Sequence, residues 1–327
     1  MREAASKDDD TTPHTMTDPT RSESDLDPKQ VPGAISHLRT TIDAAISDAL
    51  DGADLAPALR EASKYAALGP GKRVRPALAL RCAEATGSPA DREDRVMAAM
   101  PAAVAVELIH AFSLVHDDLP SLDNDDLRRG RPTLHVHSGE AMAVLAGDLM
   151  LTHAFEILAS GPWPDRVVRV VGSELAAATR QMVSGQVYDT LGGFPDGLGE
   201  AEKVELIHRL KTGALLTAAC RLGPLAAGDE PDSPNIRAVT TYAERIGLMF
   251  QIVDDLLDVE QSPDDIGKAT GKDADAGKLT FPEVLGVEES RRAIGRLESE
   301  ALAAVEPLGE SAEPLRQLCR WLAIRTR

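Results

Sequence analysis

The sequence has 327 residues and a formal net charge of −18, from 35 Lys and Arg against 53 Asp and Glu. An acidic excess of this size argues against nucleic acid as a partner, because a polyanion would be repelled. It leaves room for anionic substrates, since a local cluster of bases or bound cations reverses the charge inside a cleft. Three widely spaced cysteines without a CxxC pair favour a reducing compartment. No signal core and no run of about 18 apolar residues is found, so we expect a cytoplasmic chain without a transmembrane segment.

Residues 1–32 are polar and carry almost no large apolar side chain, so they are predicted to be a disordered leader. Residues 33–327 are rich in Ala, Leu, Val, Glu and Arg. Apolar residues recur there at helical spacing, for example at Val104, Leu108, Ala111, Phe112 and Val115. Similar stripes occur near residues 143–158, 167–187, 204–222 and 239–259, and no convincing alternating strand is found. The pattern predicts one all-α bundle whose site is built from side chains that point into its centre.

A first carboxylate cluster follows the apolar stripe, in the segment LVHDDLPSLDNDDLRRGR at residues 114–131. Asp117 and Asp118 end the predicted helix, because Pro120 cannot continue it. Asp123, Asp125 and Asp126 follow on irregular backbone. Grouped hard oxygen ligands of this kind suit Mg²⁺, which binds one or two carboxylates together with substrate phosphates.

A second cluster lies in GLMFQIVDDLLDV at residues 247–259. Asp254 and Asp258 are four residues apart and share a helix face with Gln251, while Asp255 lies about 100° around the axis. Taken alone, one such cluster in an acidic protein is equally well explained as a solvated face. Two clusters, each with an Asp pair after an apolar helical run, favour a shared site.

Although the net charge is negative, basic residues cluster in four short segments: GPGKRVRP, RRGRP, HRLKTG and IGKATGKDADAGK. Arg offers a planar fork to phosphate oxygens and Lys a point charge. GPGK is not a nucleotide-binding loop, since no GxxxxGK[ST] pattern is present. Acidic residues that can bind a metal, together with basic residues that can bind phosphate, predict a diphosphate-binding site.

These segments resemble the trans-isoprenyl diphosphate synthases. DDLPSLDNDDLRRGRPTLH and FQIVDDLLD are similar to the two aspartate-rich motifs of that family, and GKRVRP, ELIHAFSLVHDD, GQVYD and HRLKTGALL resemble its other landmarks in the same order. The resemblance runs from about residue 33 to the C-terminus. It implies an isoprenoid-synthase-type helical bundle, usually a homodimer, that condenses an allylic diphosphate (dimethylallyl or geranyl) with isopentenyl diphosphate.

The resemblance also implies the roles of individual residues. Magnesium, as three ions or with Mn²⁺ in their place, would be held by Asp117, Asp118, Asp123 and Asp254, supported by Asp255 and Asp258. The allylic diphosphate would be bound by Arg128, Lys211 and Lys268, and isopentenyl diphosphate by Lys72, Arg75, His110 and Arg129. Thr212 and Gln251 would direct oxygen dipoles at the developing cation.

Product length depends on the wall of the pocket for the growing chain, where the resemblance places Phe112, with Ser113 beside it. A large ring at that position favours farnesyl diphosphate over geranylgeranyl diphosphate, although Phe112 is as readily a member of the core stripe.

Two other interpretations were weighed. ExxH occurs twice, at Glu107–His110 and Glu205–His208, as in di-iron carboxylate bundles, but this leaves both Asp clusters unexplained. An inactive partner subunit would have lost acids that are present here.

Overall fold

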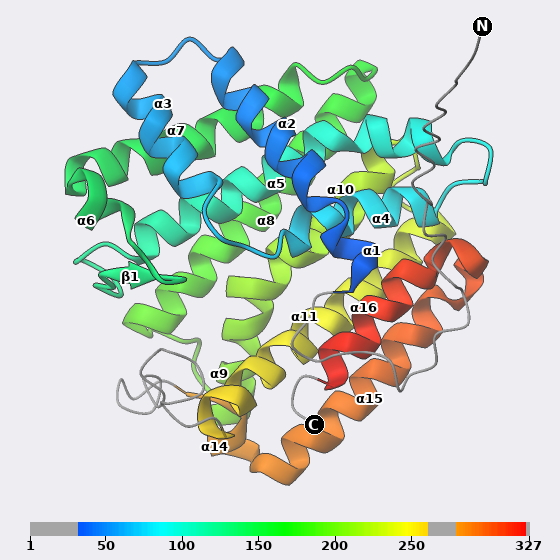
Figure 1. The fold of residues 1–327 in the computed structure, drawn as a ribbon. Coiled ribbons are helices and arrows are strands. Elements are labelled where there is room, and N and C mark those ends of the chain that lie inside the picture. The colour runs from blue at the N-terminus through cyan, green and yellow to red at the C-terminus, as the bar shows by residue number, and fades with distance from the viewer. Residues whose placement is uncertain (1–31, 261–278, 325–327) are drawn as a thin grey trace, which may run out of the picture.

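The structure is a computed structural model that describes residues 32–260 and 279–324. The predicted leader, apart from Pro32, and the predicted diphosphate ligand Lys268 lie outside these ranges. The described chain is almost entirely helical (Figure 1), which confirms the predicted all-α class. Its first half comprises α1 (Gly33–Ser36), α2 (Arg39–Gly52), α3 (Pro57–Ala67), α4 (Val74–Ala85), α5 (Arg92–Asp117), α6 (Leu134–Ser138) and α7 (Glu140–Ala159). Its second half comprises α8 (Asp165–Leu191), α9 (Glu200–Ile207), η2 (His208–Gly213), α10 (Ala214–Ala226), α11 (Pro234–Glu260), α14 (Phe281–Leu285), α15 (Val287–Val305), η3 (Glu306–Ala312) and α16 (Glu313–Ile324).

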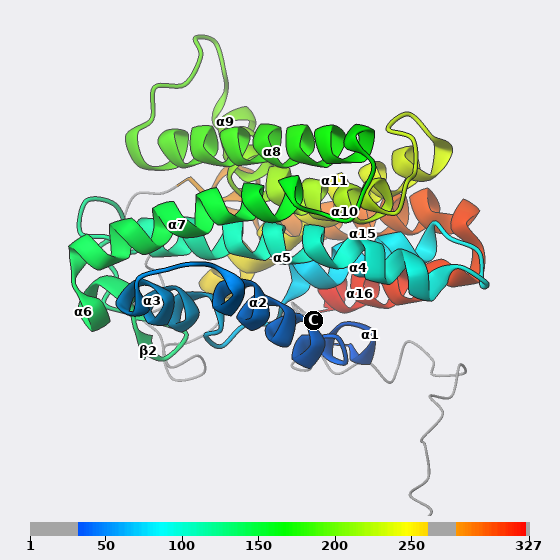
Figure 2. The ribbon, with the colours of Figure 1, turned by 90° about the horizontal axis from the view of Figure 1, so that it is seen from above.

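Helix α5 forms the centre of the bundle and contacts α4, α7 and α10. Figure 2 shows it between α7 and α8 on one side and α2 and α3 on the other. The predicted stripe from Val104 to Val115 is buried along its length, which confirms the periodicity. The helix ends at Asp117, three residues before Pro120, because proline clashes with the preceding turn. The central helix therefore delivers its two terminal aspartates to one end of the bundle.

By length and composition, α5 and α7 would each be able to cross a membrane. The bundle buries 67% of the apolar window of α5 and 39% of that of α7. For α5, this degree of burial is typical of the core helix of a helical bundle. The expected absence of a transmembrane segment stays a prediction.

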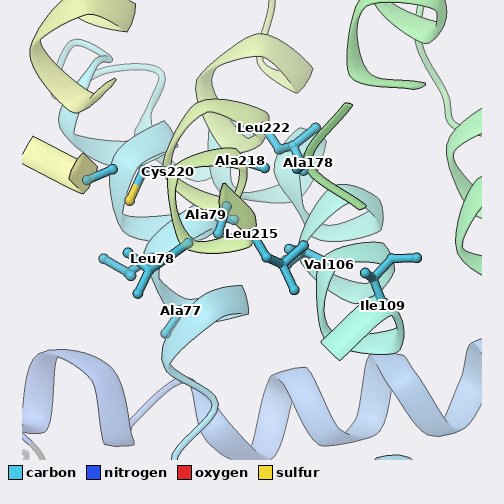
Figure 3. Close-up of a cluster of buried hydrophobic side chains, with 14 of the residues drawn as sticks. Ala77, Leu78, Ala79, Val106, Ile109, Ala178, Leu215, Ala218, Cys220 and Leu222 are labelled. Atoms are coloured by element: carbon cyan, nitrogen blue, oxygen red, sulfur yellow. The ribbon is translucent and has the colours of Figure 1, made fainter. Parts of the chain in front are cut away.

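Helices α4 and α10 pack with their backbones almost in contact. A Cβ atom on Gly223 would lie 1.8 Å from the carbonyl oxygen of Ala79, so a side chain at that position would force the two helices apart. Figure 3 shows the buried side chains gathered around this contact, including Ala79, Leu215 and Cys220. Cys82, Cys220 and Cys319 are all buried as free thiols, in agreement with the absence of a predicted disulfide framework.

Two local features were not predicted from the apolar pattern. A short antiparallel hairpin pairs β1 (Leu127–Arg128) with β2 (Arg131–Pro132). Its two loop residues, Arg129 and Gly130, both have positive φ, at 52° and 75°, as a tight two-residue hairpin requires. The second feature is η2, a π-helical segment within the predicted stripe at residues 204–222. Such bulges insert one residue into a helix and frequently occur at functional sites.

Candidate active site

A cavity of about 360 Å³ opens beside the C-terminal end of α5. One wall comes from α5 itself, with Phe112, Ser113 and Asp117, and the opposite wall is the apolar face of α8, with Met182, Val183 and Val187. The remaining polar lining comprises Arg75, His110, His116, Gln186, Thr190, Lys211 and Thr212. The cavity thus joins an apolar chamber to a rim of cations and one carboxylate, as a diphosphate with a hydrocarbon tail requires.

Asp117 and Asp123 come together although six positions separate them in the chain. The backbone N–H of Asp123 donates to the carbonyl oxygen of Asp117 at 2.8 Å, which folds the Pro-Ser insertion back over the helix end. Asn124, the one neutral residue in the acidic run, has a positive φ of 53°, a conformation in which Asn and Asp are enriched among non-glycine residues. Burial raises the pKa of Asp117 to about 6, and Asp123 also raises it, whereas Lys211 acts to lower it.

Asp118 is buried and engaged by a single partner. The Arg128 guanidinium donates through Nε to both carboxylate oxygens at 2.8 Å and through Nη2 to Oδ1 at 2.5 Å. Burial raises the pKa of Asp118, and the bond to Arg128 opposes that rise. The ion pair therefore fixes the hairpin to the end of α5 and holds Arg128 next to the first aspartate cluster.

The bases predicted to bind isopentenyl diphosphate form a second positive region. Arg75 Nη1 lies 3.2 Å from Nε2 of His110, and both residues line the cavity. Arg129 donates to the carbonyl oxygen of Pro70 at 2.7 Å, and Lys72 Nζ lies 5.0 Å above the ring of Trp321. Burial and the surrounding arginines lower the pKa of His110 well below its usual value, so the charged form of His110 is disfavoured.

The side chain of Arg73 stabilises the loop between α3 and α4. It adopts a positive φ of 52°, and its buried side chain donates to Asp43 at 2.5 Å, Glu107 at 3.0 Å and the carbonyl oxygen of Gly69 at 3.1 Å. Arg73 belongs to the basic cluster seen in the sequence, yet it faces the protein interior. Its guanidinium is therefore engaged by protein groups.

The π-helical segment η2 presents Lys211 and Thr212 to the cavity. Gly185 of α8 allows the close approach, because a Cβ atom there would lie 2.2 Å from the backbone nitrogen of Lys211. Lys211 Nζ contacts Asp189 Oδ2 at 2.5 Å, and the Asp189 side chain is only 12% exposed. Sequence reasoning assigned Asp189 no role. The signal was present in GQVYD, which was noted as a landmark without a function for its acid.

The second aspartate cluster lies on α11, across from η2. Thr212 Oγ1 donates to Oε1 of Gln251 at 3.2 Å, so the start of this cluster adjoins the cavity lining. Asp254 is close enough to Arg75 to counteract the lowering of the pKa of Arg75 by burial. Asp255 is buried, and its Oδ2 accepts a hydrogen bond from the backbone N–H of Phe281 at 3.0 Å. Asp258, half-buried, lies one turn further along the same helix.

The expected role of Gln251, which is to direct its oxygen at a developing cation, stays a prediction. Its Oε1 already faces Thr212 and, at 3.1 Å, Nδ1 of His208. The Gln251 amide therefore contacts two residues of η2, and Thr212 donates to its oxygen.

The donor set fits Mg²⁺ bound together with a substrate. In residues 32–260 and 279–324, no three acidic, His or Cys side chains are grouped closely enough to hold a metal by themselves. Magnesium dehydrates reluctantly and is commonly held by one or two carboxylates together with substrate phosphates and water. The buried carboxyl of Asp117, whose pKa is raised, and the neighbouring Asp123 supply such an incomplete ligand set.

Comparisons with known proteins agree with this geometry. A family model described as Polyprenyl synthetase matches residues 56–307. Geranylgeranyl pyrophosphate synthase 7, chloroplastic, from Arabidopsis thaliana is 44% identical over 290 residues, which cover 86% of this chain and 81% of that protein. A geranyltransferase from Legionella pneumophila has a TM-score of 0.76 at 32% identity and covers 89% of this chain and 96% of that one. A geranyltransferase from Helicobacter pylori, solved in complex with magnesium and isoprenyl diphosphate, has a TM-score of 0.71 at 29% identity over 90% and 97% of the two chains.

The helical bundle, with its cation-rimmed apolar cavity, is an isoprenoid-synthase fold. The chain belongs to the polyprenyl synthetase family and is a short-chain trans-prenyltransferase. The family recognised in the sequence is thereby confirmed.

The predicted cytoplasmic location is wrong by this comparison, because the Arabidopsis relative is named chloroplastic. Cysteine usage and the missing signal core gave only indirect evidence of compartment. The di-iron interpretation finds no support in the geometry, since Glu107 is paired with Arg73 and Glu205 is exposed to solvent.

Proposed function

We propose that the chain is a magnesium-dependent geranylgeranyl diphosphate synthase, which extends an allylic diphosphate by isopentenyl units. The observation that carries the chemistry is the cavity, where Asp117 and Lys211 stand at the polar rim of an apolar chamber. The product is argued from the 44% identical relative, whose name specifies geranylgeranyl pyrophosphate. It replaces the farnesyl product that the sequence favoured, because one ring in the pocket wall is a weaker argument than similarity over most of the chain.

In this proposal, Asp117, Asp123 and Asp254 hold the metal ions, and Asp258 supports them from the adjacent turn. Asp118 and Asp255 have carboxylate oxygens engaged by Arg128 and Phe281, so they position the two clusters. Bound magnesium would neutralise the leaving diphosphate. We propose three ions, as the family resemblance implies, with Mn²⁺ able to replace them.

The chain's own residues prepare the ionisation of the allylic carbon–oxygen bond. Arg128 and Lys211 grip the allylic diphosphate and stabilise the charge that grows on it as the bond breaks. The buried side chains of Phe112 and Met182 exclude water from the apolar chamber, so that the cation is captured by carbon. Lys72, Arg75, His110 and Arg129 bind the second diphosphate, whose double bond forms the new carbon–carbon bond and then releases a proton. Lys268 is proposed as a further diphosphate ligand and lies outside the described residues.

A farnesyl product is the second candidate, supported by Phe112. Its side chain lines the cavity and makes an edge-to-face contact with His116, with the ring centroids 5.1 Å apart. His116 is itself tied to α7 by a 3.1 Å contact between its Nε2 and the carbonyl oxygen of Val144. A ring braced in this way resists displacement by a growing chain, which favours the shorter product.

We further propose that two copies of the chain form a homodimer, each with one domain over residues 33–327. On α8, Val183, Val187 and Leu191 are 48%, 45% and 77% exposed and stand four residues apart, so they form one apolar stripe. On the contacting helix α7, Val144 and Leu145 are 40% and 55% exposed. An apolar surface of this kind supports a partner helix pair. Light scattering after size-exclusion chromatography tests it, and a monomer at micromolar concentration would contradict it.

The activity is tested by incubating the chain with dimethylallyl diphosphate, labelled isopentenyl diphosphate and Mg²⁺, followed by chromatography of the products. Geranylgeranyl diphosphate is the expected end product. Accumulation of farnesyl diphosphate without further extension would support the second candidate. No extension at any metal concentration would refute both.

A further inference from the structure

A buried carboxylate, that of Glu107 on α5, lies next to the bases proposed to bind isopentenyl diphosphate. The Glu107 side chain is only 6% exposed, and its Oε1 accepts a hydrogen bond from Nη1 of Arg73 at 3.0 Å. His110, one turn further along α5, lines the cavity and contacts Arg75 at 3.2 Å. Glu107 itself is not part of the cavity lining. Its negative charge is therefore enclosed by protein, directly behind a group of cations.

Three guanidinium groups, those of Arg73, Arg75 and Arg129, gather near this carboxylate. A Cβ atom on Gly71 would lie 2.5 Å from Nη1 of Arg129 and 3.2 Å from Nη1 of Arg73, so these two groups converge on one point of the loop. Arg75 follows two residues after Arg73, and its Nε is buried without a hydrogen-bond acceptor in the part of the chain that the structure describes. Like charges grouped in this way repel one another unless an opposite charge is close.

The ionisable groups of this region respond to one another as that argument requires. Burial lowers the pKa of Arg75 and of Arg129, and among the charged neighbours Glu107 opposes the lowering most strongly in both cases. Arg129 lowers the pKa of Arg75 further, and Arg128 and Arg73 lower that of Arg129. Glu107 is therefore the acid that most offsets the mutual repulsion of these guanidinium groups.

We propose that Glu107 is a positioning residue for isopentenyl diphosphate, whose buried negative charge holds the guanidinium groups of Arg73, Arg75 and Arg129 together before the substrate binds. The inference rests on the proposed function, which assigns Arg75 and Arg129 to that diphosphate. Glu107 acts through these arginines and does not touch the substrate. A bound diphosphate brings a second source of negative charge to the same cations. Glu107 thus stabilises the empty site and weakens the binding of the diphosphate.

The loop keeps other anchors when the charge of Glu107 is removed. Arg73 also donates to Asp43 at 2.5 Å and to the carbonyl oxygen of Gly69 at 3.1 Å. Glu107→Gln replaces the carboxylate with an amide of the same shape, so it removes the charge and changes little else. Glu107→Asp keeps the charge and shortens the side chain by one methylene. The two variants therefore separate the effect of the charge from that of the shape.

Binding of inorganic diphosphate in EDTA, measured by isothermal titration calorimetry, tests the proposal without turnover. EDTA removes divalent metal ions, so the aspartates of the two clusters repel the anion from their side of the cavity. We expect Glu107→Gln to bind diphosphate about three- to tenfold more tightly than the unaltered chain at about 50 mM salt, because the net positive charge near the anion rises by one unit. The gain should shrink to less than about twofold at about 500 mM salt. Glu107→Asp should stay within about twofold of the unaltered chain at either salt concentration.

Glu174→Gln is the matched control for the loss of one negative charge. Glu174, on α8, is paired with Arg221 at 2.6 Å and its side chain is 23% exposed, and neither residue lines the cavity. Its replacement should leave the affinity for diphosphate unchanged. A side chain that serves only the structure of the loop predicts the opposite result for Glu107→Gln, because a disturbed loop binds the anion more weakly.

Thermal unfolding measures the other half of the proposal. Without ligand, Glu107→Gln should lower the Tm by roughly 5 °C, since the guanidinium groups then repel one another without their counter-charge. Saturating diphosphate should recover most of this loss, because the anion supplies the missing charge. If Glu107→Gln is unfolded in buffer, diphosphate should restore its helical circular dichroism.

In steady-state assays with Mg²⁺, the KM for isopentenyl diphosphate should fall in Glu107→Gln, whereas the KM for dimethylallyl diphosphate should change less than about twofold. Diphosphate binding in EDTA that is unchanged or weaker, an equal gain in Glu174→Gln, or a Glu107→Gln chain that stays unfolded with diphosphate would each overturn the role of Glu107. Absence of any chain extension by the unaltered protein would instead overturn the proposed function, while the binding measurements in EDTA would still decide whether Glu107 controls anion binding.

Discussion

The carboxyl group of Asp117, a proposed metal ligand, is largely buried in the substrate-free fold, which disfavours its charged form. Burial raises the pKa of its carboxyl from 3.8 to about 6. Because the folded-state pKa lies above the unfolded value, the folded chain binds this proton more tightly than the unfolded chain does. The contribution to stability is therefore present below about pH 4 and is lost as the pH rises to about 6. The difference, 6 − 3.8 = 2.2 units, amounts to roughly 3 kcal/mol at 1.36 kcal/mol per unit.

Replacing Asp117 with Asn removes the charge and keeps the shape. Since solvent and local relaxation reduce the full value, we expect the free energy of unfolding to rise by about 1–3 kcal/mol at pH 7.5 in metal-free buffer, with a smaller gain at pH 5. Turnover should be abolished, because the metal ligand is lost. Urea unfolding followed by circular dichroism measures the first effect and product chromatography the second.

Asp126→Asn is the control, since this aspartate belongs to the same motif but its side chain is 83% exposed. Its stability should change by less than about 0.5 kcal/mol. If Asp117→Asn were no more stable than the unaltered chain at pH 7.5, or if its gain did not shrink at pH 5, the burial argument would be refuted.

Three further changes test other parts of the site. Asp254→Ala should abolish turnover and leave the helical circular dichroism intact, because it removes a metal ligand of the second cluster; near-normal activity would remove Asp254 from the metal site. Phe112→Ala should lengthen the product, because removing the ring enlarges the cavity. An unchanged product mass would place the end of the pocket elsewhere. Arg73→Ala should lower the free energy of unfolding by about 3–5 kcal/mol, since it leaves the buried carboxylate of Glu107 without its partner. A loss below 1 kcal/mol in urea unfolding would show that Arg73 does not hold this loop.

Much of the architecture followed from local pattern. Apolar residues at helical spacing predicted the long helices, and Pro120 predicted the end of α5 at the first aspartate pair. The spacing of Gln251, Asp254 and Asp258 predicted their common face, while Asp255, off that face, is the buried one. These predictions hold because periodicity and proline act within a few residues of chain.

The short hairpin and the π-helical segment were missed for a related reason. Strands of two residues are too short to alternate, and the two-residue loop Arg129–Gly130 carries only one glycine as a signal. A π-helical turn has no apolar period of its own in six residues. Its backbone packs closely against Gly185 of α8, a contact between residues of different helices.

The sequence by itself determined the helical class, the family and the two aspartate clusters, because each depends on a pattern of residues that are close together in the chain. Only the tertiary structure decided which side chains contact one another in the substrate-free fold: Asp118 and Arg128, Lys211 and Asp189, Arg73 and Glu107, and Gln251 with His208 and Thr212. The physical reason is that a side chain's partner is set by distance and burial between helices, and the order of residues 10 to 43 positions apart does not specify that distance.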